Sequence, residues 1–231
     1  AKPAHPRVGR RAAHLRNFRL ESIMSKTIAI LGGTGDLGTG LARRWAKAGH
    51  RVIIGSRAAE KAQAAAAEVE GAEGMDNLSA AQTAEIVAIT VPYENQLRTL
   101  EGVKEALAGK ILIDATVPLM PPKVGTVQLP EGGCAAVNAQ TMLGEEVIVV
   151  SAFQNVAADK LQSGDDLDCD ILVAGDKLAA REEVIQLVED AGLRGWHAGP
   201  LANSAAAEAL TSVIIQINRR YKMTAGIRIT G

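Results

Sequence analysis

The stretch of residues 26–57 constrains the fold of this chain most strongly. Residues 27–31, TIAIL, form a short apolar run rich in β-branched side chains, which is typical of a strand buried on both faces. A glycine-rich turn follows at once, and apolar residues then recur at helical spacing over residues 37–49. A second strand is predicted over residues 51–55. This order of strand, glycine turn, helix and strand predicts a βαβ unit with a ligand at its first turn.

Three glycines of that turn, Gly33, Gly35 and Gly38, have the G-x-G-x-x-G spacing. In this spacing the first glycine allows a tight turn, the second lets the backbone approach a pyrophosphate, and the third lets the helix pack closely. The helix start then presents free N–H groups to the phosphates. A glycine turn without a ligand is the alternative, and the strand and helix around the turn argue against it.

The end of the second predicted strand indicates which dinucleotide binds. An NAD site usually has Asp or Glu there, about 20 residues after the glycine turn, to hold the ribose 2′-hydroxyl. This chain instead has Ser56 and Arg57, with Lys61 one helical turn later. Because two cations and a hydroxyl suit a 2′-phosphate, we predict NADP(H) rather than NAD(H). The alternative is that both cations belong to a solvated helix start.

Strands and helices alternate along the rest of the chain, which predicts crossover connections and a parallel sheet. We therefore predict a doubly wound (Rossmann) α/β fold, mostly parallel, with a small C-terminal helical and strand extension. The expected strands are 85–91, 110–114, 147–151, 169–174 and 193–198. The expected helices are 58–69, 78–84, 94–107, 135–143, 177–191 and 202–220, and the expected loops include 71–77 and 120–130.

Length and composition limit the remaining choices. The 231 residues fit one domain with a small appendage, and we predict an NADP-binding domain over 24–160 and a smaller C-terminal part over 161–231. Residues 1–23 hold six Lys and Arg residues and one acid, and we expect a disordered extension or, alternatively, an organelle-type leader. A net charge of −1 and the lack of a long apolar run argue against nucleic-acid and membrane partners.

The cysteines and histidines suggest no reactive centre. Cys134 and Cys169 lie far apart in sequence, which favours free thiols, a cytoplasmic protein and no metal site. There is no Tyr-x-x-x-Lys, His50 lies in a turn away from the expected ligand edge, and His197 is expected to be structural. We therefore assign no catalytic residue. Hydride transfer between two ring cofactors fits this pattern, because it needs mainly close placement of the rings.

Two proline-containing loops are expected beside the glycine turn. Residues 90–93, TVPY, and residues 115–118, ATVP, each follow a predicted strand. Ligands of doubly wound sheets lie outside the carboxyl ends of the strands, so both loops are predicted to line the site. Ordinary strand-ending prolines are the alternative for either loop alone.

Several longer segments resemble a known family, the NADP reductases that depend on coenzyme F420, a deazaflavin. The segments are ILGGTGDLGTGLA, GSRAAEKA, TVPYEN, SAFQNVAA, AGPLANSAAAEALT and AGIRITG, and the resemblance runs from Lys26 to the C-terminus. It implies that the adenosine and phosphate end of NADP is held by Thr34, Gly35, Asp36, Leu37, Ser56, Arg57 and Lys61. It also implies that the rest of NADP is lined by Val91, Asn95, Val117 and Ala158, and that Ala225 lies beside the nicotinamide and the deazaflavin.

The chain departs from this family at one position. Family members typically have a histidine after the VIVVS-type strand, where this chain has Gln154. A flavin, a quinone or a small imine or keto acid therefore remains an alternative second substrate, and a non-catalytic NADP-binding protein is a further alternative. The apolar residues of the last predicted helix, Leu210, Val213, Ile214 and Ile217, lead us to expect a homodimer.

Overall fold

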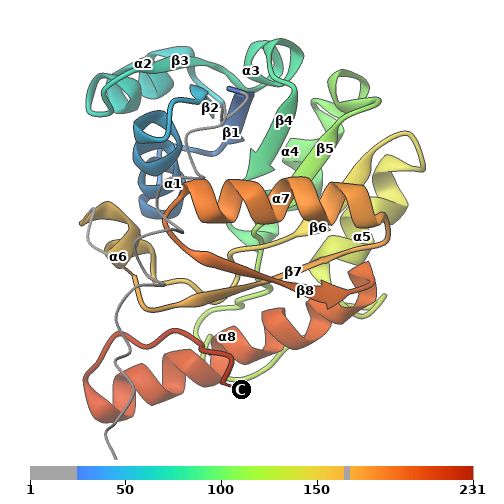
Figure 1. The fold of residues 1–231 in the computed structure, drawn as a ribbon. Helices are drawn as coiled ribbons and strands as arrows, with labels where there is room; N and C mark the ends of the chain where they lie inside the picture. Colours follow the sequence, from blue (N-terminus) through green and yellow to red (C-terminus); the bar gives the residue numbers. More distant parts are fainter. Residues whose placement is uncertain (1–24, 164–166, 231) are drawn as a thin grey trace, which may run out of the picture.

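The computed structural model describes residues 25–163 and 167–230, so the extension predicted for residues 1–23 lies outside the described residues. Within the described residues, eight strands form one sheet (Figure 1). The strands are β1 (Thr27–Leu31), β2 (Arg51–Ser56), β3 (Ala72–Asp76), β4 (Ile86–Ile89), β5 (Ile111–Asp114), β6 (Ile148–Ser151), β7 (Asp170–Gly175) and β8 (Arg194–Gly199).

The strand order is β3-β2-β1-β4-β5-β6-β7-β8. The first six strands run parallel, β7 is antiparallel to β6, and β8 is parallel to β7. This topology confirms the predicted doubly wound, mostly parallel fold. Leu31 pairs with both Gly55 and Ile89, and Ile89 pairs with Asp114. The carboxyl ends of these central strands therefore meet at one edge of the sheet.

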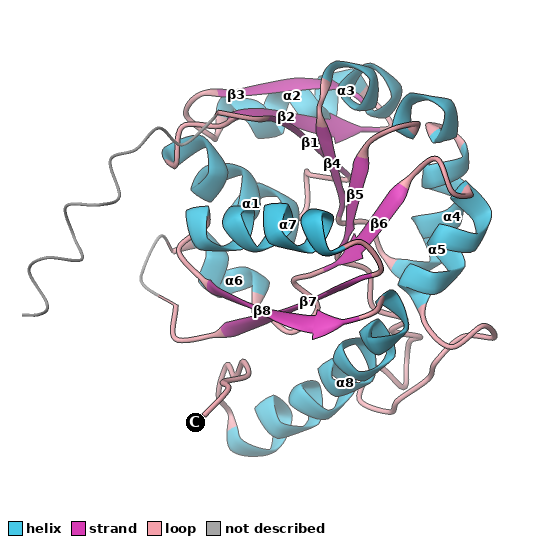
Figure 2. Cartoon of the chain, turned by 45° about the vertical axis from the view of Figure 1, so that its right-hand side comes forward, coloured by secondary structure: helices cyan, strands magenta, loops and turns pink. Residues whose placement is uncertain are grey.

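Helices cover both faces of the sheet. The helices are α1 (Asp36–Lys47), α2 (Ala59–Ala67), α3 (Asn77–Thr83), α4 (Tyr93–Glu101), α5 (Ala135–Leu143), α6 (Ala158–Gln162), α7 (Leu178–Asp190) and α8 (Ser204–Tyr221), with 3-10 helices at Lys104–Leu107 and Leu201–Asn203. Figure 2 shows α1 and α7 on one side of the central strands and α4 and α5 on the other. Helix α8 lies beyond β7 and packs on α5.

The period-two pattern of the strands explains the two layers. In β1, Ile28 and Ile30 face the cluster that includes α1 and α7, whereas Ala29 and Leu31 face the cluster that includes α3, α4 and α5. All four side chains are buried. A strand with apolar residues on both faces must be covered on both sides, which the alternating helices achieve.

One predicted loop is wrong. Residues 71–77 contain β3, an edge strand whose register with β2 places Ser56 opposite Asp76. The segment AEGMD lacks β-branched residues, so its sequence gives no strand signal. Its glycine has a packing role instead, because a Cβ on Gly74 would lie 2.4 Å from the backbone of Ala62 in α2. Tertiary packing therefore decides the conformation here.

Two further predictions need correction. The single helix predicted over 94–107 is two elements, because α4 ends at Glu101, Gly102 follows, and a 3-10 helix covers Lys104–Leu107. Helix α6 was not predicted, and its five residues are too few for a helical period to show. Leu161 of α6 packs directly on Gly40 of α1, where a Cβ would lie 2.7 Å away.

The C-terminal part continues the same sheet. Strands β7 and β8 extend the sheet beyond β6, and the residues after α8 run back to β7, where the Asp170 N–H donates to the Ile227 carbonyl at 2.9 Å. The division of the chain at residue 160 stays a prediction. Among the described helices, none is long and apolar enough to cross a membrane.

Candidate functional site

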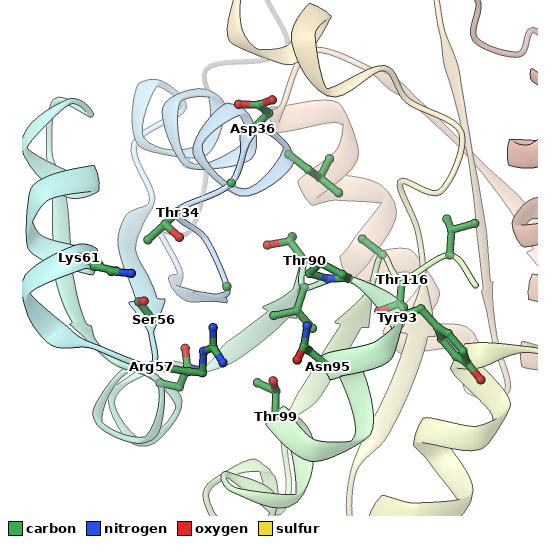
Figure 3. A pocket seen from close by; sticks show the side chains of 18 of the residues that line it. Thr34, Asp36, Ser56, Arg57, Lys61, Thr90, Tyr93, Asn95, Thr99 and Thr116 are labelled. Carbon is green, nitrogen blue, oxygen red and sulfur yellow. The ribbon is translucent and has the colours of Figure 1, made fainter. Parts of the chain in front are cut away.

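A cavity of about 910 Å³ lies at the carboxyl edge of the central strands (Figure 3). Its walls come from the turn after β1, the end of β2, the start of α2, and the loops after β4 and β5. Both proline-containing loops contribute, with residues 90–93 on one wall and residues 115–117 beside them. The edge position is where doubly wound sheets bind their ligands.

The glycine turn has the geometry expected of a phosphate-binding turn. A Cβ on Gly33 would lie 2.7 Å from the Ile30 carbonyl oxygen, and a Cβ on Gly38 would lie 2.5 Å from the Gly33 Cα. Gly35, by contrast, faces open space. It is also the N-cap of α1 and offers no side-chain cap, so the first N–H groups of that helix remain available to an anion.

Two cations converge at the end of β2. Arg57 and Lys61 are exposed, and within the described residues neither side chain has a hydrogen-bond or ion-pair partner. Ser56 is buried beside them, and α2 starts after Ala58 without a side-chain cap. Figure 3 shows these side chains at the same end of the cavity. Unpaired cations, a hydroxyl and a helix start together suit a phosphate group.

Ten of the twelve predicted binding residues line this single cavity. They are Thr34, Gly35, Asp36, Leu37, Ser56, Arg57, Lys61, Val91, Asn95 and Val117. Ala158 and Ala225 do not line it: Ala158 begins α6, and Ala225 follows α8. The binding role of all twelve stays a prediction.

Sequence reasoning missed two polar residues of the cavity, Asn77 and Thr99. Asn77 directly follows β3, so recognising that strand would have placed it at the carboxyl edge. Thr99 lies four residues after Asn95 in α4, on the same face of the helix. The helical spacing from Asn95 was therefore a usable signal.

The end of β5 carries a buried polar cluster around Asp114. Its carboxylate accepts hydrogen bonds from Nε2 of Gln96 at 2.5 Å and from the Thr116 N–H at 2.9 Å, and its carbonyl accepts one from Gln154 at 2.7 Å. Burial raises the pKa of Asp114 to about 6, although the hydrogen bonds from Thr116 and Gln96 oppose this rise. Four buried side-chain atoms of the described residues lack a partner, and three of them belong to this cluster, namely Gln96 Oε1, Thr116 Oγ1 and Gln154 Oε1.

A second buried carboxylate, Glu208 of α8, closes the start of α5. It accepts hydrogen bonds from the N–H groups of Ala135 at 2.7 Å and Ala136 at 3.2 Å, and from the Ser204 hydroxyl at 2.9 Å. Burial raises the pKa of Glu208 to about 7, against the lowering effect of these hydrogen bonds. Neither Glu208 nor Asp114 lines the cavity. Asp114 holds the loop after β5, which lines the cavity, whereas Glu208 holds the start of α5, which contributes no residue to the lining.

The histidines of the described chain lie away from the cavity. His50 is buried and bonds Asp190 at 3.0 Å and the Lys26 N–H at 3.2 Å. His197 is exposed on β8, where its Nδ1 lies 3.5 Å from Arg181. Neither histidine lines the cavity, and the structural role expected of His197 stays a prediction. Within residues 25–163 and 167–230, no group of His, Cys, Asp and Glu side chains is suited to a metal ion.

The C-terminal tail packs against the segment after β6. A Cβ on Gly226 would lie 2.5 Å from the Cys169 sulfur and 3.8 Å from the Asn155 carbonyl oxygen. Asn155 is in turn held by α8, because its Nδ2 donates to the Ala207 carbonyl at 2.7 Å and to Thr211 at 3.0 Å. The tail thus lies beside the carboxyl end of β6, next to the Asp114 cluster.

The fold, the glycine turn and the cavity define a dinucleotide-binding protein of the Rossmann class. Residues 27–118 match the family model described as NADP oxidoreductase, coenzyme F420-dependent. The chain is 40% identical over 223 residues to the F420-dependent NADP reductase of Methanothermobacter thermautotrophicus, covering 90% of this chain and 96% of the relative. The chain belongs to the F420-dependent NADP reductase family.

Two more comparisons agree with that assignment. The F420-dependent NADP reductase of Methanocaldococcus jannaschii is 42% identical over 219 residues, covering 88% of this chain and 97% of the relative. A crystal structure of a putative F420-dependent NADP reductase from an Arthrobacter species superposes with a TM-score of 0.75 at 26% identity, covering 87% of this chain and 96% of that chain. The resemblance found in the sequence is therefore confirmed at the level of the family.

Proposed function

We propose that the protein transfers a hydride between NADP(H) and coenzyme F420. The observation that carries the proposal is the phosphate corner of the cavity, where the side chains of Arg57 and Lys61 have no partner within the described residues. Neither Asp nor Glu stands at the end of β2 or in the three positions after it, where an NAD site would hold the ribose 2′-hydroxyl. In a member of the F420-dependent NADP reductase family, this corner suits the 2′-phosphate of NADP.

The residues of the cavity bind and orient rather than react. The start of α1 and the open face of Gly35 fit a pyrophosphate, and the loops after β4 and β5 enclose the remaining part of the dinucleotide. Nicotinamide supplies a hydride at its ring, so the protein needs chiefly to hold two rings in contact and exclude water. The described cavity lining contains no histidine and no cysteine, which agrees with such a role.

We also propose the second-ring position. Ala225 is held on the tail by a hydrogen bond from its N–H to Oδ1 of Asn218, and the neighbouring Gly226 packs against Cys169 and Asn155. We propose that the second ring lies beside the small side chain of Ala225. Gln154, which stands where the family typically has a histidine, is buried and donates to the Asp114 carbonyl. Its role in the described structure is therefore to fix the segment after β6.

A spectrophotometric assay tests the proposed function. Purified protein is mixed with NADPH and F420, and the loss of the oxidised deazaflavin absorbance is followed, with NADH and with riboflavin as matched controls. We expect turnover with NADPH and F420 that exceeds turnover with either control. Equal rates with riboflavin would favour a flavin reductase, and binding of NADPH without any turnover would leave a non-catalytic NADP-binding protein.

We further propose a homodimer that uses α8. Of its predicted apolar stripe, Ile214 is buried and Leu210 is half-buried, whereas Val213 and Ile217 are exposed. The exposed part of the face continues into Tyr221 and Met223. A second copy of the chain is the occupant that we propose for this face. Light scattering at micromolar concentration would overturn the proposal if it gave the mass of a monomer.

Ala158 and the two cysteines bear on the two remaining proposals, the NADP contact of α6 and the location of the protein. Ala158 is the first residue of α6, next to the wall formed by α1, which supports its predicted contact with NADP. Both cysteines are free, and burial raises the pKa of each thiol. Free and unreactive thiols support the proposed cytoplasmic location.

A further inference from the structure

The C-terminal tail, residues 222–230, is attached to the start of strand β7. Helix α8 ends at Tyr221, and the chain then turns back toward the sheet (Figure 2). The Asp170 N–H donates to the Ile227 carbonyl at 2.9 Å. The Ile229 N–H donates in turn to Oδ2 of Asp170 at 2.7 Å. One residue of β7 therefore holds the tail through both its backbone and its carboxylate.

Arg194 fixes the Asp170 carboxylate in place. The two residues are register partners at the starts of β7 and β8. The guanidinium donates from Nε to Oδ1 at 2.9 Å and from Nη2 to Oδ2 at 2.8 Å, which is the two-point geometry of the strongest ion pairs. It also lies 5.0 Å from the ring of Trp196. The Asp170 side chain is only 4% exposed, and the hydrogen bonds from Arg194 hold its pKa below the ordinary value. The pair is therefore ionised and rigid at neutral pH.

The start of β7 lies at the edge of the sheet that carries the cavity. Strand β7 runs antiparallel to β6, and Ser151, the last residue of β6, pairs with Ala174. Asp170 precedes Ala174 by four residues, so it lies about 13 Å further along, past the carboxyl end of β6. The tail that is bonded to Asp170 is thus held at the edge where doubly wound sheets bind their ligands.

The position of Ala225 in the tail is set from both sides. Its N–H donates to Oδ1 of Asn218 in α8 at 2.8 Å. On the other side, Gly226 packs on Cys169, because a Cβ on this glycine would lie 2.5 Å from the Cys169 sulfur. Asp170 directly follows Cys169, so the bonds between Asp170 and the tail keep Gly226 against that sulfur. Losing those bonds would free the chain on one side of Ala225.

We propose that Asp170 and Arg194 are positioning residues for the second cofactor, because together they hold the C-terminal tail where Ala225 borders the ring of F420. The inference rests on the proposed function and on the proposed place of the second ring. It gives β7 and β8 a role in the reaction, although neither strand contributes a residue to the cavity. Neither side chain reacts, so their loss should change how tightly F420 is held rather than the hydride transfer.

Asp170→Ala tests the proposal by steady-state kinetics. The substitution removes the acceptor of the Ile229 N–H and the partner of Arg194. We expect the KM for F420 to rise roughly tenfold, as for the loss of a charge-assisted hydrogen bond, with kcat within about threefold of the unmodified protein. The dissociation constant of NADPH should stay within about twofold, because its phosphates bind at the glycine turn and the end of β2. Asp170→Asn keeps an oxygen for the Ile229 N–H and should recover most of the loss.

Hydrogen exchange read by mass spectrometry reports on the tail directly. The amides of residues 222–230 should exchange faster in Asp170→Ala than in the unmodified protein. Glu73→Ala is the matched control, because it breaks an Arg51–Glu73 pair of the same two-point geometry, at 2.7 and 3.0 Å, between β2 and β3 at the other end of the sheet. It should alter neither tail exchange nor the KM for F420. Ile229→Pro removes the tail N–H without changing β7, and should reproduce the KM effect even if Asp170→Ala fails to fold.

The two readouts separate the possible failures. Faster tail exchange with an unchanged KM for F420 would show that the tail does not border the second ring, and unchanged tail exchange would show that the pair does not hold the tail. A parallel weakening of NADPH and F420 would indicate a general loss of structure. Each of these results would overturn the proposal. If the unmodified protein binds NADPH but does not reduce F420, the proposed function itself fails.

Discussion

Replacing Asp114 by Asn should stabilise the protein at neutral and alkaline pH. Asp114 is fully buried, with 0% of its surface exposed, and its pKa is raised by burial from 3.8 to about 6. Asn keeps an oxygen to accept from the Thr116 N–H. Its amide can donate to Oε1 of Gln96, which has no partner among the described residues, once the Gln96 amide turns by half a rotation.

The expected size follows from proton linkage. Because the folded protein binds the Asp114 proton more tightly than the unfolded chain, the unfolded chain ionises first, and stability falls as pH rises from about 4 to about 6. An interval from 3.8 to about 6 corresponds to about 3 kcal/mol lost above pH 7. Turning Gln96 sacrifices its 3.3 Å bond to the Ala135 carbonyl, so we expect a net gain of about 1–3 kcal/mol at pH 8.

Urea unfolding at several pH values between 5 and 8 measures this gain. Between pH 8 and pH 5 the advantage of Asp114→Asn should shrink by about 1.4 kcal/mol, which is about half of the linkage energy. Asp76→Ala is a matched control, because Asp76 caps α3 through Ser79 and its pKa is lowered by these hydrogen bonds. That variant should lose about 1 kcal/mol throughout the pH range. If Asp114→Asn were no more stable than the unmodified protein at pH 8, the burial argument would be wrong.

Three further predictions concern the cofactors. Arg57→Ala should weaken NADPH binding by roughly 1.5–3 kcal/mol with little change for NADH. The control is Arg43→Ala, at an exposed position of α1, which should affect the binding of neither dinucleotide. Equal losses for both dinucleotides in titrations would refute a role of Arg57 in binding the 2′-phosphate. His197→Gln should lower turnover less than about tenfold, and a loss of about a thousandfold with the fold intact would require acid catalysis. Ala225→Trp should nearly abolish steady-state turnover of F420 while NADPH titrations stay unchanged, and retained turnover would place the second ring elsewhere.

Local signals predicted the part of the site that local structure builds. The glycine turn and the residues after β2 and β4 lie within the consecutive stretch from β1 to α4, where periodicity and turn chemistry are explicit in the sequence. The sequence did not predict Asn77 as a cavity residue, because β3 gains its conformation by pairing with β2 and packing on α2. The Asp114 cluster was not predicted for a similar reason, since Gln96 and Gln154 are 18 and 40 residues away from Asp114 in the sequence.

The first N–H groups of helix α5 donate no hydrogen bond to a side chain of the residues just before the helix. Its N-cap residue, Cys134, forms no side-chain cap, and the first two N–H groups of the helix are instead satisfied by Glu208, which lies 73 and 72 residues further along the chain. During synthesis, that wall of the molecule therefore stays unfinished until α8 has emerged and docked. A fragment that ends near residue 160 would leave those two N–H groups without their carboxylate. The C-terminal helix thus completes the folding of an element that precedes it by more than sixty residues.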